Sequence, residues 1–148
     1  MLIGLDPLLS PDLLHILRAM GHGDDIVLAD ANFPAASNTA RLVRLDGIPA
    51  TDALRAILSV MPLDAHVDDP ARSMQDIAAP DALPPVVQTF QEIIDTVANT
   101  PRPIVQVERF DFYARARAAY AIVQTGEGRH FGNLLLRKGA LPPPVRGA

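Results

Sequence analysis

One histidine of the sequence, His22, stands in a setting suited to proton transfer. Glycines flank it and two acids follow it, in the run Gly21-His22-Gly23-Asp24-Asp25. An imidazole can donate and accept protons near neutral pH, so this residue is a candidate general acid or base. Its spacing from the preceding apolar stretch is equally typical of a histidine at the carboxyl end of a helix, where the helix dipole favours it. The residues alone leave both interpretations open.

Asp30 is a second candidate, because it follows the apolar run 26–29, which predicts a buried strand. Ligands of open α/β sheets gather beyond the carboxyl ends of strands. Asp30 could bind a ligand there, or orient His22 if the fold brings the two together, and it could equally cap a turn. Arg109 and the turn from Gly126 to Asn133 follow two further predicted strands. We therefore expect the ligand site at these strand ends.

No metal or cofactor motif accompanies these residues. Four of them could ligate a cation, but their spacing matches neither HExxH nor a cysteine cluster; they are His22, Asp24, Asp25 and Asp30. The pair Gly126-x-Gly128 lacks the third glycine and the following helix of a dinucleotide-binding loop. A G-x-S-x-G nucleophile motif is also missing. We expect no metal and no cofactor.

Alternating helix and strand patterns must position the candidate residues. Ser10 and Pro11 begin a helix whose apolar stripe ends at Met20, and Gly21 is expected as its left-handed C-cap. Further helices are predicted from Thr51, from near Pro85 and through 113–117; strands are predicted at 26–29, 41–45, 104–107, 120–123 and 131–136, with an irregular surface excursion at 62–82. The alternation predicts one α/β domain over residues 1–148, with a mainly parallel sheet flanked by helices and a flexible tail at 141–148.

The composition narrows the class of protein. The chain has 148 residues, 49% of them hydrophobic, which suits a single domain with a real core. A formal net charge of -4 without a basic cluster argues against nucleic acid as a partner. The chain has no cysteine, which excludes disulfides and cysteine nucleophiles and suits the cytoplasm. No run approaches the roughly 18 apolar residues of a membrane helix, so we expect a soluble chain.

A series of short motifs runs along the chain from Leu8 to Gly139. In order, they are 8–14, 20–26, 30–34, 61–64, 108–110, 125–127, 131–134 and 137–139. Each motif is weak alone, but together and in this order they resemble the L-fucose mutarotase and D-ribose pyranase family. The stretch Glu108-Arg109-Phe110 is more similar to the fucose branch than to the ribose branch.

The resemblance implies an α/β fold of that family and exchange of the α and β anomers of L-fucose by acid–base-assisted ring opening, without a cofactor. It implies His22 as the proton donor. It further implies that the sugar is bound by Asp30, Arg109, Phe131, Gly132 and Asn133. Ring-shaped homo-oligomers, decamers among the bacterial members, are also implied, with active sites near subunit contacts. D-ribose pyranase activity and a non-catalytic sugar-binding role are the alternatives.

One position departs from the family pattern. The family usually has tyrosine before Gly132 and Asn133, and here Phe131 stands in its place. A phenolic hydroxyl is therefore missing at this position. Stacking of an aromatic ring on the apolar face of a sugar is retained.

Overall fold

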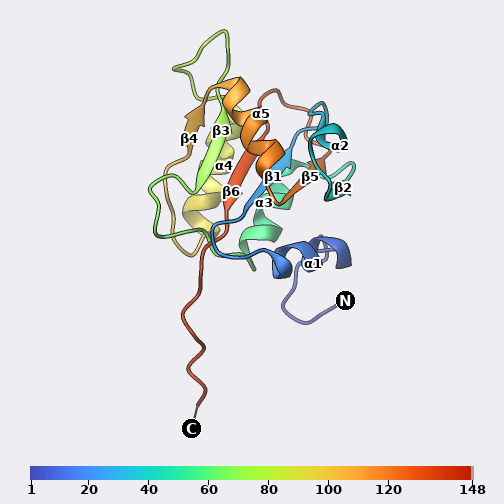
Figure 1. The fold of residues 1–148 in the computed structure, drawn as a ribbon, viewed down its shortest axis with the longest axis vertical. Coiled ribbons are helices and arrows are strands. Elements are labelled where there is room, and N and C mark those ends of the chain that lie inside the picture. The colour runs from blue at the N-terminus through green and yellow to red at the C-terminus, as the bar shows by residue number, and fades with distance from the viewer. Residues whose placement is uncertain (148) are drawn as a thin grey trace.

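A six-stranded sheet forms the centre of the molecule in the computed structural model, which describes residues 1–147 (Figure 1). Its strands are β1 Asp25–Ala29, β2 Leu42–Leu45, β3 Ala71–Met74, β4 Val105–Val107, β5 Ala121–Thr125 and β6 Leu134–Arg137. They lie in the order β2-β5-β1-β6-β3-β4. Only β6 runs antiparallel to its neighbours, β1 and β3. The predicted mainly parallel α/β fold is confirmed, with β6 as its exception.

Helices cover both faces of this sheet, so the domain has three layers (Figure 1). They are α1 Pro11–Ala19, α2 Ala35–Asn38, α3 Ala50–Leu58, α4 Pro85–Val97 and α5 Arg109–Ala118. One core joins α1, α3 and α4 to the strand face that carries Ile26 and Leu28. The other joins α2 and α5 to the face that carries Val27 and Ala29. Because successive side chains of a strand point to opposite faces, the apolar run of β1 serves both cores.

The first helix begins as predicted and ends differently. The Ser10 side chain accepts a hydrogen bond from the first turn of α1. Gly21, however, does not take the left-handed conformation of a C-cap. The helix ends at Ala19 with Met20 as its C-cap, and the ammonium group of Lys138 donates to the carbonyls of Leu17 and Met20 instead. The predicted glycine cap is therefore wrong, because a distant lysine satisfies the last carbonyls.

Two other elements also differ from the prediction. The helix that Thr51 was expected to cap begins at Ala50 instead, with Pro49 as its N-cap and without a side-chain cap. The supposedly irregular excursion 62–82 contains β3, a fully buried strand between β4 and β6. Its sequence includes the buried Arg72, so it lacks the apolar pattern by which a central strand is recognised.

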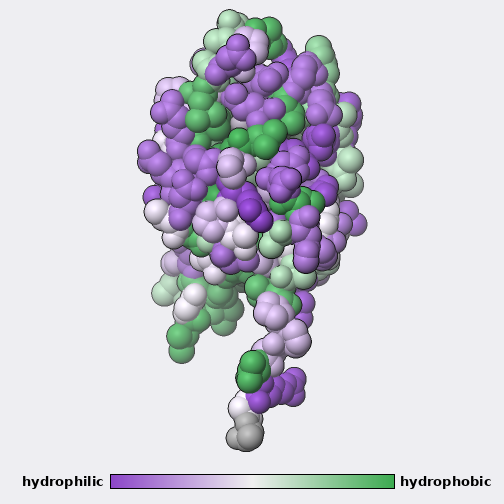
Figure 2. Space-filling model, turned by 90° about the vertical axis from the view of Figure 1, so that its left-hand side faces the viewer, coloured by the Kyte–Doolittle hydropathy of each residue, from purple (hydrophilic) through white to green (hydrophobic). Residues whose placement is uncertain are grey.

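The Pro-rich end of the chain extends away from the domain. Residues 141–147 are all exposed, and the tail projects from the body of the molecule (Figures 1 and 2). The flexibility of this tail stays a prediction. Among the described residues, no helix has the length and apolar character needed to cross a membrane.

Candidate functional site

A pocket of about 290 Å³ opens at the edge of the sheet where β1, β3, β4 and β5 end and β6 begins. Its lining residues are Asp30, Asn32, Phe33, Met74, Ile77, Arg109, Tyr113, His130, Phe131 and Asn133. Four of the five residues expected to bind a ligand therefore meet here, and the fifth, Gly132, lies between two of them. Strands that end at one edge bring these distant segments together.

Asp30 and Asn133 form a buried, reciprocal pair at this pocket. The Asp30 amide donates to Asn133 Oδ1 at 2.8 Å, and Asn133 Nδ2 donates to Asp30 Oδ2 at 2.9 Å. The amide of Asn32 donates to the other carboxylate oxygen, Oδ1, at 3.0 Å. Both paired residues are less than a tenth exposed. The carboxylate is therefore held in one orientation, and its remaining lone pairs can accept hydrogen bonds from a ligand.

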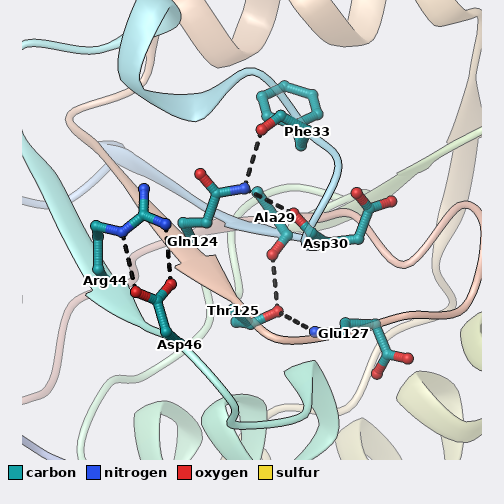
Figure 3. A network of polar contacts seen from close by, with 8 residues as sticks. All are labelled: Ala29, Asp30, Phe33, Arg44, Asp46, Gln124, Thr125 and Glu127. Atoms are coloured by element: carbon teal, nitrogen blue, oxygen red, sulfur yellow. Dashed lines mark hydrogen bonds and ion pairs between the residues drawn. The ribbon is translucent and has the colours of Figure 1, made fainter.

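The backbone that carries Asp30 is fixed by side chains of β5 (Figure 3). Gln124 Nε2 donates to the carbonyls of Asp30 and Phe33, both at 2.9 Å. Thr125 Oγ1 donates to the carbonyl of Ala29 at 2.8 Å. In Figure 3 the Asp30 carboxylate points away from Gln124. The strand end is rigid, and the carboxylate is left for the pocket.

The segment before β6 is a turn with two unusual residues. Phe131 has a φ of 62°, in the left-handed region that side chains rarely adopt. Gly132 is buried, and a Cβ there would lie 2.6 Å from Glu127 Cγ. Alternation along the predicted strand 131–136 would turn His130 away from whatever Phe131 faces. The strand begins only at Leu134, however, and both residues line the pocket.

Glu127 stabilises this turn through contacts with Arg129 and Gly132. Its buried carboxylate accepts hydrogen bonds from Arg129 Nε at 2.8 Å and Nη2 at 3.0 Å. The hydrogen bonds from Arg129 lower the pKa of Glu127 and outweigh burial, which raises it. The carboxylate is therefore charged at neutral pH, and the Cγ methylene of the same side chain packs against Gly132.

Arg109 enters the pocket from the first turn of α5. Glu108 begins this helix by accepting hydrogen bonds from two backbone amides through its side chain. The Arg109 guanidinium carbon lies 5.7 Å from the centre of the Tyr113 ring, which stacks on Phe33 at 5.1 Å. Within residues 1–147, no hydrogen bond or ion pair engages the Arg109 side chain, which is exposed and available to a ligand. Tyr113 was not among the expected site residues.

His22 lies at the opposite edge of the sheet. It precedes β1, whereas Asp30 follows β1, and a five-residue strand spans about 16 Å. Its Nε2 atom is 3.1 Å from Oδ1 of Asp64, not beside Asp30. Within one chain the fold therefore does not bring Asp30 beside His22, and Asp64 has the place that Asp30 would need in order to orient the imidazole.

The partner of His22 is a buried carboxylate. Burial raises the pKa of Asp64, but hydrogen bonds from the His66 amide and from His22 outweigh burial and lower it overall. With Nε2 directed at Asp64, Nδ1 of His22 is the nitrogen left to exchange a proton. Asp64 was not among the expected site residues, because it is far from His22 along the chain. Among residues 1–147, no three His, Asp or Glu side chains come close enough to hold a metal ion.

The fold and the pocket define an α/β domain that can bind a small polar ligand at one edge of its sheet. The sequence model of the RbsD / FucU transport protein family matches residues 3–141, and the chain belongs to this family.

Similar proteins include sugar mutarotases. An L-fucose mutarotase of Haemophilus influenzae is 46% identical over 144 residues, covering 96% of this chain and 99% of the relative. The crystal structure of a fucose mutarotase in complex with L-fucose, from Streptococcus pneumoniae, is 41% identical with a TM-score of 0.88, covering 95% of this chain and 100% of that one. RbsD of Bacillus subtilis, complexed with D-ribose, is 20% identical with a TM-score of 0.68 over 90% of this chain and 95% of its own, and shares the fold.

Proposed function

We propose that the chain is a mutarotase that interconverts the α and β anomers of L-fucose. The observation that carries this proposal is the fixed Asp30–Asn133 pair, with the free Arg109 beside it and aromatic rings on the same pocket. A pyranose has hydroxyls that need directional hydrogen bonds and flat faces that pack on aromatic rings. The similarity to L-fucose mutarotases supports this choice of sugar.

The reaction opens the pyranose ring and closes it on the other face. One group removes the proton of the O1 hydroxyl while another protonates the ring oxygen, so the bond between C1 and the ring oxygen breaks and the aldehyde forms. Reclosure after rotation about the C1–C2 bond reverses both proton transfers. Acid–base catalysis by positioned groups accelerates a reaction by about 10²–10⁴-fold. This acceleration is sufficient here, because the anomers already interconvert without a catalyst.

In this proposal a doubly protonated His22 donates the Nδ1 proton to the ring oxygen, while Asp64 faces Nε2 and orients the imidazole. Asp30, Arg109 and Asn133 bind hydroxyls, and Phe131 stacks on the sugar. Gly132 has no side chain, which leaves room for Glu127 beside it, and in this proposal the backbone of its turn contacts the sugar.

Because His22 and the pocket lie at opposite edges of the sheet, we propose that each active site joins two copies of the chain. His22 of one copy would meet the pocket of the next, a head-to-tail contact that closes into a ring. The half-exposed His22 imidazole supports such a contact, since its outer side is free to enter a neighbouring pocket. A ring-shaped decamer is the assembly that the family resemblance implies.

We also propose that the protein works in the cytoplasm. The lack of cysteine suits a reducing compartment, where disulfides do not persist. The expected partners are a monosaccharide and further copies of the chain, with no nucleic acid and no membrane.

Two-dimensional exchange NMR of equilibrated L-fucose tests the proposal. The wild-type protein should intensify the exchange cross-peaks between the α and β anomers, and His22→Gln should abolish this gain. His15→Gln is the matched control, because His15 is an exposed histidine on α1. Saturable binding of L-fucose without faster exchange would indicate a non-catalytic binding role. Faster pyranose–furanose exchange of D-ribose alone would indicate a ribose pyranase.

A further inference from the structure

The segment after β6, residues 137–139, lies against the turn that carries His22. The backbone amide of Lys138 donates to the carbonyl of Asp24 at 2.9 Å, and the carbonyl of Lys138 accepts from the amide of Gly23 at 2.9 Å. Arg137 adds an ion pair, with its Nε 3.1 Å from Oδ1 of Asp25. The backbone on the carboxyl side of His22 is therefore bound to this segment.

The same segment also holds the residue that pairs with His22. The amide of Asp64 donates to the carbonyl of Arg137 at 3.1 Å, and the amide of Gly139 donates to the carbonyl of Pro62 at 2.8 Å. A Cβ at Gly139 would collide with the Leu63 carbonyl, so the close approach of the two backbones requires glycine. One short segment thus fixes both sides of the histidine–aspartate pair.

The Lys138 side chain extends this connection to the backbone on the amino side of His22. Its Nζ atom donates to the carbonyls of Leu17 at 2.7 Å and Met20 at 2.5 Å, at the end of α1. These carbonyls would otherwise lack partners, because Gly21 does not form the left-handed cap. Burial lowers the pKa of Lys138, with the nearby Arg18 adding to this effect. The ammonium group therefore serves as the hydrogen-bond donor that caps the carboxyl end of α1.

We propose that Lys138 is a positioning residue for His22, and that residues 137–139 set the separation of His22 from Asp64. This inference rests on the proposed mutarotase function. Lys138 binds the turn from both ends: its backbone holds Gly23 and Asp24, and its side chain holds Met20. Removing the ammonium group frees the amino end of the turn, so the imidazole no longer keeps a single distance from the carboxylate.

Lys138→Met tests this role, because it keeps the length and apolar stem of the side chain and removes the donor. We expect kcat for anomer exchange to fall roughly ten- to a hundred-fold, the range that misplacement of a catalytic group by a fraction of an ångström to one ångström produces. KM for L-fucose should stay within about two-fold, since the pocket residues are at the other edge of the sheet. Lys138→Arg should recover most of kcat, and Arg18→Met, which removes a neighbouring exposed charge, should leave it unchanged.

A second readout follows His22 directly, through the ¹⁵N and ¹H resonances of its imidazole. Wild-type protein should contain one dominant tautomer, protonated at Nε2 and bonded to Asp64, and Lys138→Met should populate both. Lys138→Gln provides the same test if the methionine variant does not fold, because its amide nitrogen is one bond closer to the backbone and cannot reach both carbonyls. Wild-type kcat together with an unchanged His22 spectrum in the folded variant would overturn the proposal, as would a change confined to KM. If wild-type protein does not accelerate exchange, the mutarotase proposal fails, whereas the imidazole spectrum still tests the positioning role.

Discussion

The buried Asp30–Asn133 pair allows a substitution that changes its charge and almost nothing else. Asn133→Asp replaces the Nδ2 donor, which lies 2.9 Å from Asp30 Oδ2, by a second carboxylate oxygen. Two unit charges about 4 Å apart repel by about 4 kcal/mol at an effective dielectric constant near 20. Protonating one carboxyl at pH 7 relieves the repulsion, at a cost of about 4 kcal/mol given an ordinary aspartate pKa near 3.9. Both routes predict a loss of about 4 kcal/mol in the free energy of unfolding.

The same reasoning predicts how this loss depends on pH. The folded variant holds a proton that the unfolded chain releases at pH 7, so its stability relative to wild type increases as the pH falls. The penalty should shrink by about 1.4 kcal/mol per pH unit and become small near pH 4, where the unfolded carboxyls also bind protons. Urea denaturation followed by circular dichroism, on variant and wild type at pH 7 and pH 5, measures the difference.

A double substitution provides the control. Asp30→Asn combined with Asn133→Asp exchanges the two groups, and residue 133 can still accept from the backbone amide of residue 30 while the new amide donates to the new carboxylate. The double variant should recover most of the stability that Asn133→Asp loses, with a coupling of 1 kcal/mol or more, the size expected for residues in direct contact. A penalty that is equal at both pH values, or simple additivity of the two substitutions, would refute the reasoning.

Three further outcomes are expected. Gly132→Ala should lower the free energy of unfolding by about 1–3 kcal/mol, because its Cβ would lie 2.6 Å from a neighbouring side-chain carbon. Gly128→Ala is the control and should not lower it, because a Cβ there would have nothing within 4 Å. Equal urea midpoints for the two variants would contradict this prediction. Because its pKa is lowered, the Asp64 carboxylate stabilises the fold above about pH 4, and this contribution is lost as the pH falls through the lowered value. Asp64→Asn should therefore flatten the acid side of the profile of Tm against pH. Asp68→Asn, at an exposed aspartate, should leave that profile as in wild type. D-arabinose has the same pyranose ring as L-fucose without the methyl group on C5. Ile77→Ser should reduce the preference for L-fucose over D-arabinose by about four-fold, which is the effect of one buried methyl group. An unchanged ratio of the two exchange rates would contradict a contact between Ile77 and this methyl group.

Features with local causes could be predicted from the sequence. Ser10 and Pro11 define the start of α1 because a side-chain cap and a proline at the first turn act within a few residues. Arg109 and Asn133 meet Asp30 at one edge because strand ends converge there, which the alternation of elements already indicates. These are consequences of short-range chemistry and of general sheet topology.

Features that depend on distant partners could not be predicted. The strand β3 carries the buried Arg72, and only its place between two other strands makes such a sequence a central strand. Gly21 has the type and spacing of a helix C-cap, but Lys138, at the other end of the chain, replaces that cap. The pairing of His22 with Asp64 depends in the same way on segments that meet only in the folded chain.

The central claim is that a mutarotase site joins His22 of one copy to the pocket of another, and complementation of two inactive variants tests it most directly. His22→Gln and Arg109→Ala should each fail to accelerate the exchange of L-fucose anomers. In oligomers co-assembled from equal amounts of both, about a quarter of the sites combine an intact histidine with an intact pocket, as random filling of a head-to-tail ring requires. We predict about a quarter of the wild-type exchange rate from the mixture. A mixture as inactive as its two components would contradict the account.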